Sequence, residues 1–215
     1  MKVIPREAGR TTYSTEIRAL KKSLVLSEYQ KAIVIGTILG DGCLCDNWSK
    51  TNYRLKMSHS IKQQEYVLWK YSVLKNWILT EPKIHEKTKS ITIRTISHPE
   101  LTDLHAIFYQ DKKKIIPQNI EDLLSPIALA VWFMDDGNAV RHKSGDIYAY
   151  NLNTQSFDRP EHQILIKVLR DKFDLHPNIN KNNGSLRLYI GVKDKINFAN
   201  LIKDYIVPSM QYKIG

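Results

Sequence analysis

The segment "AVWFMDDGNAV", residues 130–140, places two carboxylates, Asp135 and Asp136, at the end of an apolar run and directly before Gly137. A helix that ends there carries negative charge where its own dipole is already negative, which is unfavourable. A second apolar run, "VIGTILGDG" at residues 34–42, ends in the same way on Asp41 and Gly42. This recurrence indicates an internal repeat.

One constant offset, 95 residues, relates the two segments and extends well beyond them. It aligns Tyr53, Leu55 and Met57 with Tyr148, Tyr150 and Leu152, Pro82 and Ile84 with Pro177 and Ile179, and Ile91 and Ile93 with Leu186 and Leu188. A shared offset of this kind predicts two similar structural units. We therefore divide the chain into a basic N-terminal arm (1–26), a first half (27–117) and a second half (118–215), and expect the halves to pack together because no Gly/Ser-rich linker separates them.

Both halves have the same predicted order of elements. A helix over 28–41 or 126–136 precedes a strand over 52–58 or 147–153, an amphipathic helix over 62–78 or 159–173, further strands that include 89–96 and 184–192, and a last helix over 99–110 or 193–206. Ser27 with Gln30 forms a predicted capping box, and Ser125 before Pro126 is typical of a helix start. The first helix of each half is apolar almost all round, should be buried, and should stop at a glycine. The fold class is therefore α+β, with two αββαββα-type halves whose strand count stays open.

The amino-acid composition limits the classes of function that the chain can have. The 215 residues have 42% hydrophobic and 25% charged content, a net charge of +10 and a pI of about 9.5. A field of that sign favours polyanions such as nucleic acid, although a solvated basic surface has the same composition. No apolar run approaches the roughly 20 residues that span a bilayer, so no membrane partner is expected. The N-terminus lacks the apolar centre of a secretory signal, so we expect an intracellular protein, with a mitochondrion or chloroplast compatible with the sequence and the compartment left open.

Two cysteines, Cys43 and Cys45, are too few for a disulfide framework or a structural zinc site. We interpret them as two small side chains after a turn. The seven histidines show no zinc-ligand spacing and are interpreted mostly as surface or DNA-contact residues.

A divalent cation resolves the conflict at the acidic helix ends. Carboxylates, backbone carbonyls and water are the hard oxygen ligands that Mg²⁺ prefers. If the two apolar helices pack side by side, with Gly36 and Gly40 allowing close approach, Asp41 and Asp136 meet at one end. Enzymes commonly hydrolyse phosphodiesters with metal ions that paired carboxylates hold, because the metal ions activate water and stabilise the leaving oxygen. The competing interpretation is that each helix ends in Asp-Gly through turn chemistry alone.

Alternation along the strands separates an apolar face from a polar face. Ile91 and Ile93 define one apolar face, and Leu186, Leu188, Ile190 and Val192 define another. The polar side chains that we predict to contact DNA are Arg54, Lys56, Ser58, Thr92, Arg94, Asn151, Asn153, Arg187 and Tyr189. Such groups donate to phosphates and base edges, and a ribbon of strands fits a major groove. An ordinary hydrated sheet face has the same residue types.

The two motifs, "VIGTILGDG" and "LAVWFMDDG", resemble those of the LAGLIDADG homing endonucleases, in particular monomeric intron-encoded members. The resemblance extends through "KKKIIPQNI", "LNTQSF" and "IVPSMQYK", and covers most of the chain from about residue 27. Thr37 and Gly40 depart from the family's letters in the first motif, whereas the acid is retained at Asp41.

The resemblance implies a pseudo-dimer interface formed by the motif helices, and antiparallel sheets that form a DNA-binding saddle. It implies that Asp41 and Asp136 bind Mg²⁺, with Mn²⁺ as a substitute, and that the carbonyls of Gly40 and Asp135 are further ligands. Lys114 and Lys213 match peripheral basic residues that polarise water or stabilise the transition-state phosphate. The implied protein is a monomer that cuts both strands of a long asymmetric duplex and leaves short 3′ overhangs.

Two other functions use the same scaffold. An RNA maturase would assist splicing of its host intron, so intron RNA is a possible partner. A noncatalytic DNA-binding protein would have lost the acids, and the presence of Asp41 and Asp136 argues against it. Retention of both acids and both lysines favours cleavage over either alternative.

Overall fold

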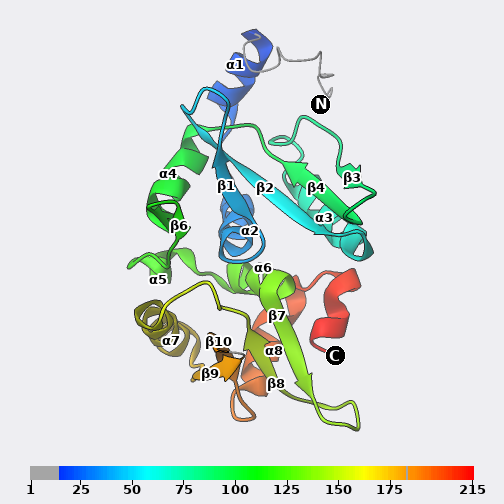
Figure 1. Ribbon diagram of the computed structural model, residues 1–215, viewed down its shortest axis with the longest axis vertical. Coiled ribbons are helices and arrows are strands. Elements are labelled where there is room, and N and C mark those ends of the chain that lie inside the picture. Colours follow the sequence, from blue (N-terminus) through cyan, green and yellow to red (C-terminus); the bar gives the residue numbers. More distant parts are fainter. Residues whose placement is uncertain (1–14, 183) are drawn as a thin grey trace. The chain divides into compact units, whose positions relative to one another are not determined.

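Two four-stranded antiparallel sheets carry the fold of the computed structural model, which describes residues 15–182 and 184–215 (Figure 1). The first sheet has the order β1-β2-β4-β3 and the second has the order β7-β8-β10-β9. The first sheet consists of β1 (Cys43–Asp46), β2 (Tyr53–Ser60), β3 (Lys83–His85) and β4 (Ser90–Arg94), and the second of β7 (Gly137–Arg141), β8 (Ile147–Leu152), β9 (Asn178–Asn182) and β10 (Ser185–Ile190).

The helices alternate with these strands as predicted. The first series contains α2 (Glu28–Leu39), α3 (Gln64–Val73) and α4 (Pro99–Phe108), and the second contains α6 (Pro126–Asp136), α7 (Arg159–Phe173) and α8 (Lys195–Ile202). Each series therefore follows the order αββαββα, which confirms the α+β fold class. The shorter elements are α1 (Thr15–Ser23), β5 (Tyr109–Gln110), β6 (Lys113–Lys114), α5 (Ile120–Leu123), and the 3-10 helices η1 (Ile61–Gln63), η2 (Lys203–Tyr205) and η3 (Pro208–Lys213).

The strand registers repeat at the offset found in the sequence. Met57 pairs with Ile93 in the first sheet. Adding 95 to both positions gives Leu152 and Leu188, which pair in the second sheet. The pairs of β1 with β2 recur in β7 with β8 at the same offset, up to a bulge between Val140 and Arg141. The outer hairpins differ in length, because four residues connect the last pair of β3 and β4 whereas two connect that of β9 and β10.

Strands β1 and β7 complete the predicted αββαββα order, although the sequence analysis located only one strand between the first two helices of each half. Cys43 and Cys45 lie in β1 rather than in irregular chain after a turn. Both strands are short and begin with at most three residues between them and a helix end, so neither shows a full period of alternation. The strand β7 begins at Gly137, directly after α6.

The motif helices α2 and α6 are the most buried elements of the chain. Residues 32–39 of α2 and 128–135 of α6 are all buried, as their apolar sequences predicted. The predicted caps are present: Ser27 and Gln30 exchange two hydrogen bonds of 3.2 Å, and the Ser125 side chain accepts from the amide of Ala128. The two helices touch at Gly36, where a Cβ atom would lie 2.4 Å from the Ala128 carbonyl oxygen.

The chain forms two compact units. One contains residues up to 31 together with 41–105, and the other contains 32–40 together with 106–215. In the first unit, α3 packs against β2 and β4, and the ring nitrogen Nε2 of His98 lies 2.9 Å from the Lys21 carbonyl oxygen in α1. In the second unit, α6 contacts α8 and β7. The predicted arm contributes α1 to the first unit, and its residues 1–14 lie outside the described residues.

The positions predicted on the apolar faces of β4 and β10 are buried except Leu186, which is half-buried, and Val192. Ile91 and Ile93 are each 2% exposed, and Leu188 and Ile190 are fully buried. Val192 was predicted on the same face but is 67% exposed, because β10 ends at Ile190 and alternation no longer fixes the direction of the side chain. In the described part of the chain, no helix has the length and apolar character needed to span a bilayer.

Candidate functional site

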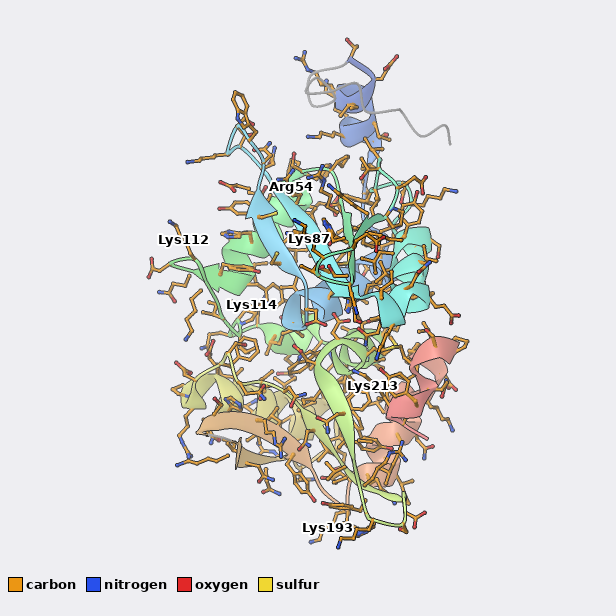
Figure 2. All side chains as sticks on the ribbon, turned by 45° about the vertical axis from the view of Figure 1, so that its right-hand side comes forward. Arg54, Lys87, Lys112, Lys114, Lys193 and Lys213 are labelled. Atoms are coloured by element: carbon orange, nitrogen blue, oxygen red, sulfur yellow. The ribbon has the colours of Figure 1, made fainter. Side chains whose placement is uncertain are left out.

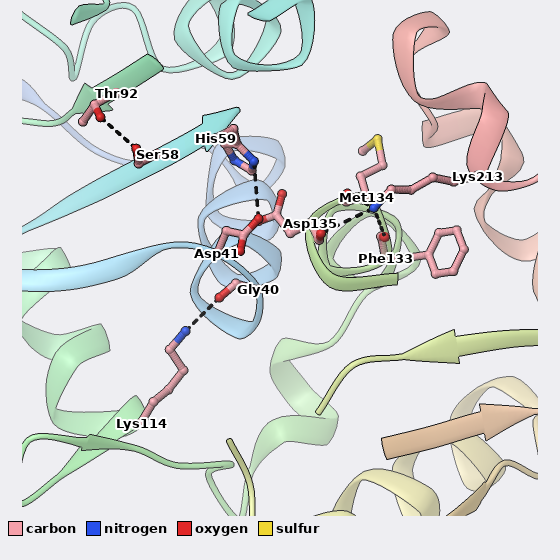
Figure 3. Close-up of polar contacts among 10 residues, drawn as sticks. All are labelled: Gly40, Asp41, Ser58, His59, Thr92, Lys114, Phe133, Met134, Asp135 and Lys213. Atoms are coloured by element: carbon pink, nitrogen blue, oxygen red, sulfur yellow. Dashed lines mark hydrogen bonds and ion pairs between the residues drawn. The ribbon is translucent and has the colours of Figure 1, made fainter. Parts of the chain in front are cut away.

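A lysine reaches the C-terminal end of helix α2. Lys114 Nζ donates a hydrogen bond of 2.9 Å to the Gly40 carbonyl oxygen (Figure 3). The lysine is held by the small hairpin β5–β6, in which Tyr109 pairs with Lys114 and the connecting residues Asp111 and Lys112 have φ angles of 48° and 65°. Two successive residues with positive φ form the tight turn that matches the twist of a two-stranded hairpin. Figure 2 shows Lys112 projecting from this turn, whereas Lys114 points back toward the body of the protein.

A second lysine reaches the C-terminal end of helix α6. Lys213 Nζ lies 3.5, 2.5 and 3.4 Å from the carbonyl oxygens of Phe133, Met134 and Asp135, and the residue is only 9% exposed (Figure 3). It is the last residue of η3. The final carbonyls of a helix lack intrahelical donors and carry partial negative charge, so an ammonium group at this position is favourable. Each motif helix therefore receives a cation at its end.

His59 lies beside the acid that follows α2. Its Nδ1 atom is 3.4 Å from Asp41 Oδ2, and the side chain is 1% exposed whereas that of Asp41 is 41% exposed (Figure 3). The ring also contacts Tyr66 edge to face, with centroids 5.3 Å apart. The buried His59 imidazole therefore holds one side of the Asp41 carboxylate in position, and the other side of the carboxylate stays open to solvent.

The histidines were interpreted mostly as surface or DNA-contact residues, and a surface position is wrong for His59, His98 and His162, which are 5%, 6% and 0% exposed. The alternation of β2 contained the signal for His59, since it falls in phase with the buried Leu55 and Met57. His59 lies on the inner face of β2, near the end of the strand, and is a candidate site residue. A search for the sequence spacing of zinc ligands does not detect such a single histidine.

The glycines at the two helix ends serve close packing. A Cβ atom on Gly40 would lie 2.4 Å from the Asp135 Cβ, and one on Gly137 would lie 2.0 Å from the Phe133 ring. Helix α6 ends at Asp136 and Gly137 is its C-cap, as predicted, with extended backbone angles of φ −91° and ψ 157°. Asp135 is 8% exposed and its side chain packs against Gly40, whereas Asp136 is half-buried.

The polar face of the first sheet is accessible. Lys56 and Ser58 are exposed on β2, while Arg54, Thr92 and Arg94 are half-buried. Lys56 pairs with Arg94 across the β2–β4 ladder, and Ser58 shares a hydrogen bond of 2.9 Å with Thr92. The structure therefore brings these five predicted residues together on one sheet face, with two strands contributing cations.

The matching face of the second sheet is more enclosed. Asn151 is 2% exposed, and its Oδ1 atom has no hydrogen-bond partner among the described residues, as is also true of Arg187 Nε. Tyr189 pairs with Asn151, and Asn153 donates from Nδ2 to Asn138 Oδ1 at 3.3 Å. Buried polar atoms without a partner are costly, so this face holds hydrogen-bonding groups that the described residues do not satisfy.

An acid and a lysine at the end of each of two buried helices define a class of protein. Carboxylates, carbonyl oxygens and ammonium groups are the groups that metal-assisted phosphoryl chemistry uses, and the polar strands add a surface for a polyanion. The class is that of two-motif nuclease folds. Residues 31–198 match the LAGLIDADG DNA endonuclease family, and the chain belongs to this family.

Relatives with established names support the assignment. The chain is 32% identical to probable intron-encoded endonuclease 1 of Wickerhamomyces canadensis, over 90% of this chain and 87% of that protein. It is 28% identical to the cytochrome b mRNA maturase bI2 of Debaryomyces hansenii, over 85% of this chain and 72% of that protein. It is also 30% identical, over 88% of its length, to the protein RecA of Mycolicibacterium flavescens, of which it spans about half, 47%.

Solved structures agree with the fold. The homing endonuclease I-WcaI bound to its DNA recognition sequence superposes with a TM-score of 0.87 and 28% identity, covering 97% of this chain and 96% of that one. The complex of I-DmoI with DNA and Mn has a TM-score of 0.51 and 17% identity, covering 81% of this chain and 96% of that one, and it shares the fold.

Proposed function

We propose that the protein is a site-specific DNA endonuclease that hydrolyses phosphodiesters on both strands of a long asymmetric duplex and leaves short 3′ overhangs. The observation that carries the proposal is the repeated acid–lysine arrangement. Asp41 follows the helix end that Lys114 contacts, and Asp136 ends the helix that Lys213 contacts. Two such ends supply one reaction centre for each strand. Because both lie in one chain, the active form is a monomer.

The residues present fit a divalent metal ion. The Asp41 and Asp136 carboxylates, with the backbone oxygens of Gly40 and Asp135, are hard oxygen donors that suit Mg²⁺, with Mn²⁺ as a substitute. The Asp41 side chain, at 41% exposure, can still reach a ligand. A bound Mg²⁺ would activate water and neutralise charge on the scissile phosphate.

The lysines and the buried histidine orient this chemistry. Lys114 and Lys213 each hold an ammonium group at a helix end, where it offsets negative charge and can donate to a phosphate oxygen in the transition state. His59 fixes one face of the Asp41 carboxylate through the 3.4 Å contact. These chain groups therefore position the reacting phosphate and stabilise its developing charge.

The polar strand faces supply binding and sequence recognition. Arg54, Lys56, Ser58, Thr92 and Arg94 in the first sheet, and Asn151, Asn153, Arg187 and Tyr189 in the second, offer donors for phosphates and base edges. The partnerless atoms of Asn151 and Arg187 support this role, since a base edge or an ordered water would satisfy them.

One experiment tests the proposal directly. A randomised duplex library is incubated with the protein and Mg²⁺, and cleaved molecules are sequenced to recover the site and the overhang. The same selection with Asp136→Asn serves as the control, because the amide removes one ligand charge at nearly constant shape. Recovery of one long site by the wild type alone supports the proposal, whereas identical products from both proteins would contradict it.

A second function, assistance of intron splicing, is favoured by the likeness to the maturase of Debaryomyces hansenii. It would use host intron RNA as a partner and would not need the acids. A maturase assay with Asp136→Asn separates the two activities: splicing assistance that persists when cleavage is lost would show dual function. The absence of any splicing effect from the wild type would exclude it.

A further inference from the structure

Two thiols and two cations share one face of the β1–β2 strand pair. Cys43 and Cys45 alternate along β1 and project to the same side, while Leu44 between them is buried. Cys43 pairs with Lys56 and Cys45 pairs with Arg54 across the ladder. Figure 2 marks Arg54 on β2. Because β1 is the edge strand of its sheet, both thiols lie at the border of the face that carries these cations.

This environment favours the thiolate form of Cys45. The hydrogen bond from Cys43 is the largest cause that lowers the pKa of Cys45, to about 6, and Arg54 and Lys56 lower it further although partial burial opposes them. On β1, Asp46 is the nearest carboxylate, and alternation places it on the opposite face from Cys45. A thiolate that is accessible and flanked by cations is the reactive form of cysteine.

We propose that Cys45 is a site of reversible modification by low-molecular-weight disulfides such as oxidised glutathione, and that the modified protein loses affinity for DNA. The Cys45 thiolate attacks one sulfur of the disulfide, the original sulfur–sulfur bond breaks, and the second half leaves as a thiolate. The product is a mixed disulfide on Cys45. A second thiol reverses the exchange, so no net oxidant is consumed.

Strand geometry keeps the product from closing into an internal bridge. Residues two apart on a strand rise by about 6.6 Å and point the same way, whereas a disulfide needs Cβ atoms roughly 3.5–4.5 Å apart. Cys43 is therefore not the disulfide partner of Cys45, whose Sγ lies 3.8 Å from the Arg54 carbonyl oxygen. The mixed disulfide persists until an external thiol removes it.

The effect on DNA rests on the proposed function, whereas the reactivity of Cys45 does not. Glutathione adds a bulky group of net negative charge beside Arg54 and Lys56, which shields or neutralises cations that would contact phosphates. At the positions 95 residues further, β7 carries Asn138 and Val140, so only the first sheet has this site.

The first test measures thiol reactivity with the chain of residues 1–215. Wild type, Cys45→Ser and Cys43→Ser react with 5,5′-dithiobis(2-nitrobenzoate) over a range of pH, and the released chromophore is followed by stopped flow. We expect a fast phase with a midpoint near the Cys45 pKa of about 6, lost in Cys45→Ser and shifted to higher pH in Cys43→Ser. A fast phase that survives in Cys45→Ser, or wild-type rates equal to those of glutathione itself, would overturn the proposal.

The second test measures DNA binding by anisotropy of a labelled random-sequence duplex with Ca²⁺, before and after treatment with oxidised glutathione. Wild type should bind about tenfold more weakly after treatment, because added negative charge and lost phosphate contacts act together, and dithiothreitol should restore binding. Cys45→Ser should bind normally and stay insensitive. Unchanged binding by the verified mixed disulfide would overturn the DNA effect, whereas an untreated wild type that fails to bind DNA would contradict the proposed function alone.

Discussion

At the C-terminal ends of α2 and α6, a lysine offsets the negative charge of the last helix carbonyls, but the two lysines are buried to different degrees. At the end of α2, Lys114 comes from a two-stranded hairpin, is half-buried, and donates to one carbonyl at 2.9 Å. At the end of α6, Lys213 comes from a 3-10 helix, is 9% exposed, and lies within 3.5 Å of three carbonyls. The comparison teaches that a duplicated motif preserves the charge pattern while the supporting structure diverges.

The largest expected effect comes from removing the acids. Asp41→Asn and Asp136→Asn should each lower the cleavage rate by about three orders of magnitude, because a metal contributes several kcal/mol to the transition state. DNA affinity should be kept or increased, since a negative charge near phosphates is removed. Strand-specific cleavage assays check whether each variant spares one strand. An equal loss on both strands would mean that the two helix ends do not act separately.

The next effect concerns the crowded glycines. Gly137→Ala should lower the free energy of unfolding by about 1–3 kcal/mol, the usual cost of overpacking, because its Cβ would meet the fully buried Phe133 ring at 2.0 Å. Gly40→Ala should cost less, since the Asp135 side chain that it meets keeps 8% exposure. Urea unfolding measures both. Gly191→Ala is the matched control, with its nearest contact at 3.2 Å, and a control as unstable as Gly137→Ala would refute the packing argument.

Replacing the lysines compares the two ends directly. Lys213→Met should destabilise the protein by about 1–3 kcal/mol, because the helix end loses a buried ammonium donor, whereas Lys114→Met should cost about 1 kcal/mol or less at its partly exposed site. Thermal unfolding of the two variants gives the difference. Equal losses would show that burial of Lys213 contributes nothing to stability.

The smallest effect distinguishes the two polar faces. Lys56→Ala should reduce the slope of log affinity against log salt by about 0.9, the value for one phosphate contact, because Lys56 is exposed on β2. Asn151→Ala should leave the slope unchanged, as its neutral side chain is 2% exposed. Salt titrations of DNA binding measure both slopes. A reduced slope in Asn151→Ala would remove the distinction between the faces.

The sequence predicted the parts of the fold that depend on long patterns. The apolar helices, their caps at Ser27 and Ser125, and the offset of 95 all appear in the structure, and the offset extends to individual cross-strand pairs. It missed β1 and β7, because a strand of four or five residues beside a helix end has too few positions to show a period. Val192 was misplaced for the related reason that alternation holds only inside a strand.

The candidate site was predicted less completely. Sequence patterns identified the acids, and resemblance pointed to the lysines, but neither indicated which carbonyls Lys114 and Lys213 contact, since those contacts join residues more than 70 positions apart. His59 escaped notice because a single buried histidine has no motif. The roles of these residues in cleavage stay predictions.

The shared register between the first two strands of each sheet has a practical consequence for redesign. Residues 43–58 and 138–153 are the same length, and their ladders match up to the bulge between Val140 and Arg141. A graft of one segment in place of the other would keep the paired positions before the bulge in phase and move a whole set of surface side chains at once. We expect exchange at these boundaries to be tolerated once the bulge is matched, whereas exchange of the outer hairpins would first require a two-residue adjustment.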